Sequence, residues 1–139
     1  MLYKKCAKLD ELFGVAKEII NILPKSAVIF LEGDLAFGKT TLVSYIAKVL
    51  NLEGATSPTF TLEQIYGDRL FHYDFYRVDF GEILELGLIE EFEKEGLHFV
   101  EWGGEELKEL LKSAGFRIFN LKIEPKQECR EYILEEIDA

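Results

Sequence analysis

The sequence predicts an α/β fold in which helices flank a central mixed, mostly parallel sheet that also contains antiparallel hairpins. The apolar run at residues 27–31, AVIFL, is typical of a strand buried on both faces, as strands of a parallel sheet are. A glycine-bearing loop follows this run, and beyond the loop apolar residues recur at helical spacing. Later in the chain, two pairs of apolar stretches indicate the hairpins.

Two amphipathic helices are predicted in the first part of the chain. Within residues 8–26, apolar residues recur at helical spacing until Pro24 closes the stretch. From Lys39 onwards, a second apolar stripe follows the same period. The first stripe consists of Leu12, Ala16, Ile19 and Leu23, and the second of Leu42, Val43, Ile46, Val49 and Leu50.

The remaining elements are strands and short helices. Residues 59–78 read as two strands joined through Gly67 and Asp68, a dipeptide that suits a tight hairpin turn. Aromatic and polar residues alternate in the second strand, which predicts one apolar face and one polar face that carries His72 and Asp74. The later predictions are one or two short helices over 81–96, a strand over 97–102, a helix over 104–115, and a strand pair over 116–124 and 130–137.

Composition restricts the class of protein. A chain of 139 residues that is 48% hydrophobic can bury a core of its own, and we expect one domain over residues 1–139. The net charge of -10 argues against a protein that binds nucleic acid by itself, because Lys and Arg supply most of that affinity.

Cys6 and Cys129 show no metal or redox spacing, so we expect two free thiols in a reducing cytosol. The sequence shows no membrane-spanning stretch, and we expect a cytoplasmic protein without a membrane partner.

Residues 33–40, GDLAFGKT, match the phosphate-binding pattern G-x-x-x-x-G-K-[ST] in full. The strand before it and the helix after it are the context that this pattern requires, so we expect a small P-loop NTPase-like fold. Gly33 and Gly38 would let backbone N–H groups surround phosphates at the positive end of the helix dipole. Lys39 would reach the β and γ oxygens, and the Thr40 hydroxyl would bind Mg2+.

Two acids are candidates for the carboxylate that a phosphate-bound Mg2+ needs at a neighbouring strand end. Glu101 ends an apolar strand, which is the place of a Walker B acid, and ranks first. Asp74 is then a candidate for orienting the attacking water or anchoring a switch segment. His72 is interpreted as a hydrogen-bonded, half-buried histidine rather than a catalytic one. The absence of an N-K-x-D stretch from the sequence favours ATP over a guanine nucleotide.

Several motifs follow one another in the order and spacing of a known family. They are GDLAFGKTT, SPTF at 57–60, HYDFYR at 72–77, LGL at 86–88 and EW at 101–102. This ordered set, from about Ala27 to Trp102, resembles the TsaE (YjeE) family, the ATPases of bacterial tRNA threonylcarbamoyladenosine biosynthesis. The resemblance implies a small P-loop fold with a mixed sheet, binding of ATP and Mg2+, and weak ATP hydrolysis.

The resemblance also implies partners. Members of this family join the TsaB and TsaD proteins, which attach a threonylcarbamoyl group to the adenosine beside the anticodon of ANN-decoding tRNAs. The nucleotide cycle is expected to reset that complex between turnovers, and tRNA is expected to be reached through the complex rather than by this chain alone. The acidic character of the chain fits this expectation, because a negative surface favours a basic protein partner over bare tRNA.

Roles for individual residues are implied by the same resemblance. Thr40 and Glu101 would be the Mg2+ ligands, and Asp74 an acid important for hydrolysis. Together with Glu101 and Asp74, Lys39 would form the catalytic set. Ser57 and Thr59 would belong to a switch-like loop that hydrogen-bonds the γ-phosphate or a partner; the alternative is a polar loop that leads into a strand. The nucleotide-binding residues would be Gly33, Asp34, Leu35, Ala36, Phe37, Gly38, Lys39, Thr40, Thr41 and Trp102.

Two features leave alternatives open. Thr41 lies either near the α-phosphate or on the helix as an ordinary residue. Ala36 and Phe37 stand where the family usually has glycine and a small residue, and alanine tolerates positive φ poorly, so either the loop would be slightly reshaped or Phe37 would pack over the phosphates or outward.

Two other functions compete with a partner-stimulated ATPase. A small-molecule kinase would need a lid with several arginines, but only Arg69 and Arg77 occur between Lys39 and Glu101. A binding module would use ATP to hold a fold for docking, without turnover. A phosphate loop in so short a chain is best explained if the second substrate is water and the second body is another protein that supplies an arginine.

Overall fold

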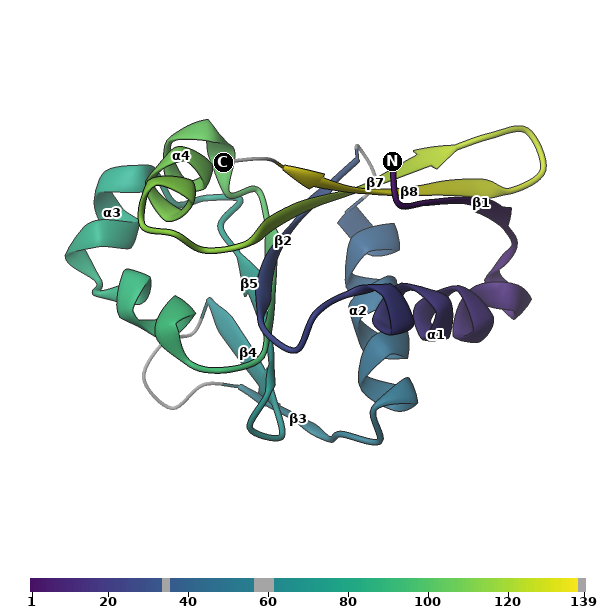
Figure 1. Cartoon of the computed structure of the whole chain (residues 1–139), viewed down its shortest axis with the longest axis horizontal. Helices are drawn as coiled ribbons and strands as arrows, with labels where there is room; N and C mark the ends of the chain where they lie inside the picture. Colours follow the sequence, from purple (N-terminus) through teal and green to yellow (C-terminus); the bar gives the residue numbers. More distant parts are fainter. Residues whose placement is uncertain (34–35, 57–61, 138–139) are drawn as a thin grey trace.

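The computed structural model contains one eight-stranded sheet (Figure 1). It describes residues 1–33, 36–56 and 62–137, except for the side chains at positions 36, 37, 55 and 56. The strand order is β1-β8-β7-β2-β6-β5-β4-β3. The strands are β1 Tyr3–Ala7, β2 Ala27–Glu32, β3 Gly54–Thr56, β4 Glu63–Tyr66, β5 Leu70–Asp74, β6 Leu97–Glu101, β7 Ile118–Pro125 and β8 Arg130–Ile137. The helices are η1 Leu9–Glu11, α1 Leu12–Ile22, α2 Ala36–Val49, α3 Phe80–Glu85, η2 Leu88–Glu93 and α4 Gly104–Ser113.

The centre of the sheet is parallel and its edges are antiparallel. Strands β7, β2, β6 and β5 pair in parallel, whereas β8 and β1 on one side and β4 and β3 on the other pair antiparallel. The run from Ala27 to Leu31 in β2 is buried throughout, as a strand with neighbours on both edges and helices on both faces must be. The predicted fold class is confirmed.

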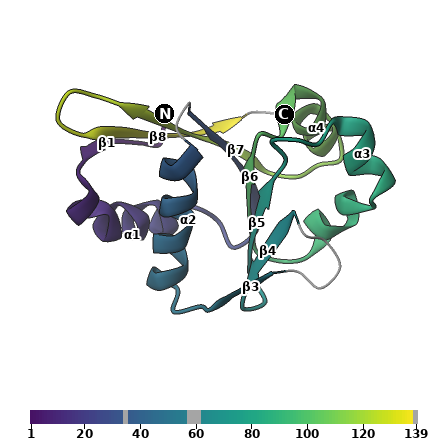
Figure 2. The same cartoon turned by 180° about the vertical axis from the view of Figure 1, so that it is seen from behind.

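Helices cover both faces of the sheet (Figures 1 and 2). On one face α1 and α2 pack against Ile29 and Leu31 of β2. On the other face α3, η2 and α4 pack against Val28 and Phe30. Because successive side chains of a strand point to opposite faces, one apolar run supplies both clusters. Within the described ranges, no helix is long and apolar enough to cross a membrane.

Two details differ from the sequence predictions. Helix α2 begins at Ala36 rather than at Lys39. The prediction placed the start too late because the first turn consists of residues of the phosphate loop, which precede the apolar stripe. The expected polar face of β5 is wrong at His72, which is only 7% exposed because the sheet face that carries it is covered by α2. Asp74, at the end of the same strand, is exposed as predicted.

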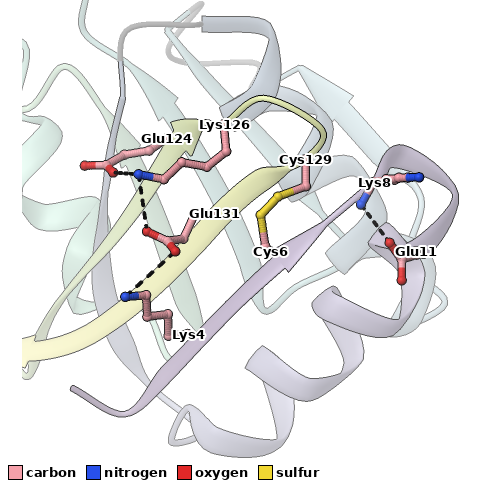
Figure 3. Close-up of a disulfide and its surroundings, with 8 residues drawn as sticks. All are labelled: Lys4, Cys6, Lys8, Glu11, Glu124, Lys126, Cys129 and Glu131. Carbon is pink, nitrogen blue, oxygen red and sulfur yellow. Dashed lines mark hydrogen bonds and ion pairs between the residues drawn. A yellow bond between two sulfur atoms is a disulfide. The ribbon is translucent and has the colours of Figure 1, made fainter.

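The expectation of two free thiols is also wrong, since Cys6 and Cys129 form a disulfide (Figure 3). Strand β1 pairs with β8 so that Cys6 lies opposite Glu131, which brings it within reach of Cys129 at the β7–β8 turn. The two Cα atoms are 5.6 Å apart across a sequence separation of 123 residues. Local spacing could not reveal this pairing, because it depends on β1, an edge strand whose residues before Ala7 are exposed or half-buried.

Candidate functional site

The candidate residues meet where three parallel strands end. Gly33 follows β2, Asp74 ends β5 and Glu101 ends β6. In the sheet register, Glu101 lies between Leu31 on one side and Asp74 on the other. Open α/β sheets bind ligands at the carboxyl ends of their strands, and this edge holds the predicted phosphate loop.

Both loop glycines are in close contact with the neighbouring β7–β8 hairpin. A Cβ atom at Gly33 would lie 2.5 Å from the backbone oxygen of Ile123, and the φ angle of Gly33 is +150°. A Cβ atom at Gly38 would lie 3.1 Å from Nη1 of Arg130. Glycine is therefore required at position 33 by both the backbone contact and the positive φ, whereas a Cβ atom at position 38 would need only a small shift of the flexible Arg130 side chain.

Lys39 is held by two groups at the loop. Its Nζ donates a hydrogen bond of 2.9 Å to the backbone oxygen of Gly33 and lies 3.8 Å from the ring centre of Trp102. Trp102 follows β6 directly and has a φ of +60°, an uncommon value for a bulky residue. Its ring also meets Tyr76 edge-on, with the ring centres 5.1 Å apart. The ammonium thus lies between the loop backbone and an aromatic face.

A hydroxyl, a carboxylate and an imidazole converge beside Lys39. Thr40 Oγ1 donates to Glu101 Oε2 at 3.0 Å, and Nε2 of His72 hydrogen-bonds the same carboxylate oxygen. Glu101 is 1% exposed. The three side chains come from α2, β6 and β5, so the contact depends on the fold. The hydrogen bond predicted for His72 is present, but the residue is buried rather than half-buried.

Asp74 lies next to this group in the sheet and makes a separate contact. Its Oδ1 accepts a hydrogen bond of 3.1 Å from the backbone N–H of Tyr76, and its side chain is exposed. The structure therefore brings Thr40, Glu101 and Lys39 together, and places Asp74 beside them with an accessible carboxylate.

A family model described as Threonylcarbamoyl adenosine biosynthesis protein TsaE matches residues 6–132. The chain belongs to the TsaE family. The family resemblance predicted from the motifs is thus confirmed, and the match extends beyond those motifs at both ends, from Cys6 to Tyr132.

Relatives in the TsaE family resemble the chain over most of its length. The tRNA threonylcarbamoyladenosine biosynthesis protein TsaE of Aquifex aeolicus is 40% identical over 100 residues, 67% of this chain and 70% of that protein. The protein of the same name from Bacillus subtilis is 36% identical over 118 residues, 76% of this chain and 74% of that protein. The crystal structure of YdiB from Bacillus subtilis has a TM-score of 0.63 and 28% identity, and the similarity covers 94% of this chain and 80% of that one.

Some residues assigned through the TsaE resemblance are not described in the structure. Ala36 and Phe37 lie in the first turn of α2, and only their backbone is described. Their effect on the loop stays a prediction. The residues that lie outside the described ranges altogether are Asp34, Leu35, Ser57 and Thr59.

Sequence reasoning missed part of the site in this TsaE protein. Gly33, Lys39 and Trp102 line a cleft of about 240 Å3 whose other wall includes Lys108 of α4. Nζ of Lys108 lies 3.3 Å from Glu32 Oε1, and the residue is 7% exposed. A lysine in an amphipathic helix is ordinarily exposed to solvent, so nothing in the local pattern indicates this buried position.

Proposed function

We propose that this chain is a P-loop ATPase that binds ATP with Mg2+ and supports tRNA N6-threonylcarbamoyladenosine modification together with TsaB and TsaD. Its nucleotide cycle resets that complex between turnovers. One observation carries the proposal: the 3.0 Å hydrogen bond between the Thr40 hydroxyl and the Glu101 carboxylate, directly beside Lys39 in the first turns of α2. The names of the TsaE relatives support the assignment to tRNA modification.

The donor atoms present fit Mg2+. One hydroxyl and one carboxylate, completed by phosphate oxygens and water, form the set that Mg2+ prefers in nucleotide sites. Across residues 1–33, 36–56 and 62–137, no cluster of three or more His, Cys, Asp and Glu side chains could hold a metal by itself. This pattern suits a metal that arrives with its nucleotide. Thr40 and Glu101 would hold the ion, which when bound neutralises charge on the β and γ phosphates.

Lys39 changes partners when the nucleotide binds. Phosphate oxygens are stronger acceptors than the backbone oxygen of Gly33, so the ammonium leaves that oxygen for the β and γ phosphates. The N-terminal end of α2 attracts the same phosphates through its dipole. Trp102, which now lies over Nζ of Lys39, then borders the nucleotide pocket.

His72 and Asp74 have different tasks in this proposal. His72 fixes the orientation of the Glu101 carboxylate by hydrogen-bonding the oxygen that accepts from Thr40. Asp74 is adjacent to Glu101 in the sheet register and presents an exposed carboxylate, which would orient the attacking water.

Hydrolysis by the chain alone is expected to be slow. The cleft that Lys39 shares with Trp102 is lined by two lysines and, among the described residues, by no arginine, and the guanidinium of Arg130 lies against Gly38 outside this cleft. An arginine supplied by a second protein can accelerate phosphoryl transfer by about 10^3 to 10^5. A partner would therefore determine the rate.

Repeated tRNA modification tests the proposal. TsaB and TsaD would be supplied with tRNA and the threonylcarbamoyl donor, and modified tRNA counted per complex over time. We expect repeated turnover only when this chain and ATP are both added, and no such effect from Lys39→Ala. Equal product with the wild-type chain and with the folded Lys39→Ala variant would contradict the proposed role of the nucleotide cycle.

A further inference from the structure

A second cleft lies beside the phosphate loop, between the segment that follows β1 and the turn of the β7–β8 hairpin. This hairpin cleft has a volume of about 480 Å3. Lys8 and Leu9 line one wall, Lys126 and Arg130 line the other, and Thr41 of α2 contributes from the helix. The Cys6–Cys129 disulfide joins the strand of the first wall to the turn of the second (Figure 3).

The β7–β8 hairpin, which forms one wall of this cleft, also contacts the phosphate loop. Ile123 of β7 approaches Gly33, and Arg130 of β8 approaches Gly38, so closely that neither glycine has room for a larger side chain without movement. Arg130 follows Cys129 directly in the chain. A displacement of the hairpin turn would therefore be transmitted to the loop through these two contacts.

The hairpin cleft and the Thr40–Glu101 contact lie on opposite sides of β2. Thr40 bonds Glu101 in β6, on one side of β2, and this side receives the metal and the terminal phosphates. Thr41 lines the hairpin cleft next to β7 and β8, on the other side of β2. A nucleotide whose β and γ phosphates meet Lys39 and Thr40 thus extends towards this cleft.

Apart from the disulfide, the two walls are joined by the pairing of β1 with β8, which runs from Tyr3–Leu134 to Ala7–Arg130. Strand β1 has five residues, lies at the edge of the sheet and pairs only with β8. The turn of the hairpin is closed by one backbone hydrogen bond of 2.8 Å, from the N–H of Lys126 to the oxygen of Cys129. Edge strands and turns are the parts of a fold that open at the lowest free energy. The disulfide links two such parts.

We propose that the Cys6–Cys129 disulfide is a redox-sensitive clamp that holds the hairpin against the phosphate loop, so that the oxidised protein binds ATP more tightly than the reduced protein. The inference rests on the proposed binding of ATP. A dithiol reductant releases the clamp: the Cys6–Cys129 bond breaks, each cysteine sulfur gains one electron and one proton, and the two sulfurs of the reductant join in a new disulfide.

Calorimetric titration with ATP and Mg2+ tests the clamp. The full chain would be prepared in oxidised form and after treatment with dithiothreitol, with thiols counted under denaturing conditions in each preparation. We expect the Kd for ATP to rise about fivefold or more on reduction, a typical size for coupling between two sites. The Cys6→Ser/Cys129→Ser variant should bind like the reduced protein and ignore the reductant.

A control separates the clamp from loss of stability alone. Ile83→Ala weakens the core on the opposite face of the sheet, away from the hairpin cleft, and should keep the Kd of the oxidised wild-type protein. If the Cys6→Ser/Cys129→Ser variant does not fold, the comparison of the Kd for ATP between the oxidised and the reduced wild-type protein tests the clamp by itself. Two free thiols in the untreated, air-oxidised protein, or an equal Kd in both redox states, would overturn the clamp alone. Failure of the oxidised protein to bind ATP would overturn the proposed ATPase as well.

Discussion

Glu101 is the residue at which the chemistry of the site converges. Its buried carboxylate accepts from the Thr40 hydroxyl and contacts His72, so its orientation is fixed. Lys39 and Trp102 pack against each other next to it. The sequence predicted Glu101, Thr40 and Lys39 because each occupies a fixed place after a strand or in the loop pattern. It could not predict that Lys108 would be buried in the adjacent cleft, because that depends on the packing of α4 beside β2.

The substitution Glu101→Gln removes the charge and keeps the shape. If the carboxylate holds Mg2+, kcat for ATP hydrolysis should fall about 100-fold or more, since even indirect ligand partners contribute 10 to 100-fold. Binding of ATP in EDTA should be unchanged, because Lys39 and the loop remain. Steady-state hydrolysis and calorimetry measure the two effects. An unchanged kcat would remove Glu101 from the metal site.

His98 predicts a pH dependence of stability. Its Nδ1 accepts a hydrogen bond from the Tyr73 hydroxyl at 2.8 Å, its Nε2 donates to the backbone oxygen of Lys94 at 2.7 Å, and its ring stacks on Phe71. Burial lowers the pKa of His98 from 6.5 to about 4. The unfolded chain therefore takes up a proton as the pH falls below 6.5, whereas the folded chain does so only near pH 4.

Stability should consequently be lost as the pH falls through this window. Between pH 7 and pH 4 the His98 contribution to the unfolding free energy should decrease by up to about 3 kcal/mol. Urea denaturation of the wild type and of His98→Gln at both pH values measures it, since carboxylates contribute to both proteins alike. The same pH dependence in the two proteins would show that His98 is not the cause.

At the scale of elements, the junction between β2 and the phosphate loop is the most constrained. Gly33→Ala would place a Cβ atom 2.5 Å from the backbone oxygen of Ile123 at a φ of +150°. We expect the unfolding free energy to fall by at least about 2 kcal/mol. Chemical denaturation measures the loss.

The chain contains a matched control for this substitution. Gly14 lies in α1 with nothing within 4 Å of a Cβ atom, so Gly14→Ala should raise stability by about 0.5 to 1 kcal/mol. Equal effects of the two alanine substitutions would mean that contact with β7 does not constrain the loop.

Elements that bury one apolar stripe were predictable from sequence, and those that bury little were not. Strand β2 was found from its unbroken apolar run and helices α1 and α2 from their periodicity, because burial against the sheet or by helices on both faces imposes these patterns. Strand β1 was missed because Lys4 and Lys5 are exposed and its partner β8 lies at the other end of the chain. The disulfide at Cys6 was missed for the same reason.

For the whole molecule, the strand order determines where the site lies. Parallel pairing of β2, β5 and β6 gathers Gly33, Asp74 and Glu101 at one edge of the sheet, although they are far apart in the sequence. The order of motifs indicated the TsaE family, and the spatial arrangement follows from the parallel centre of the sheet. The net charge of -10 further favours a protein partner over direct binding of tRNA.

Mg2+-dependent ATP hydrolysis by the purified chain is the decisive test of a partner-stimulated ATPase. Hydrolysis would be measured with the chain alone and with a TsaB–TsaD complex and tRNA, in each case with Lys39→Ala for comparison. We expect slow hydrolysis that rises with the complex and disappears in the variant. Normal ATP binding without any stimulation by the complex would contradict this expectation.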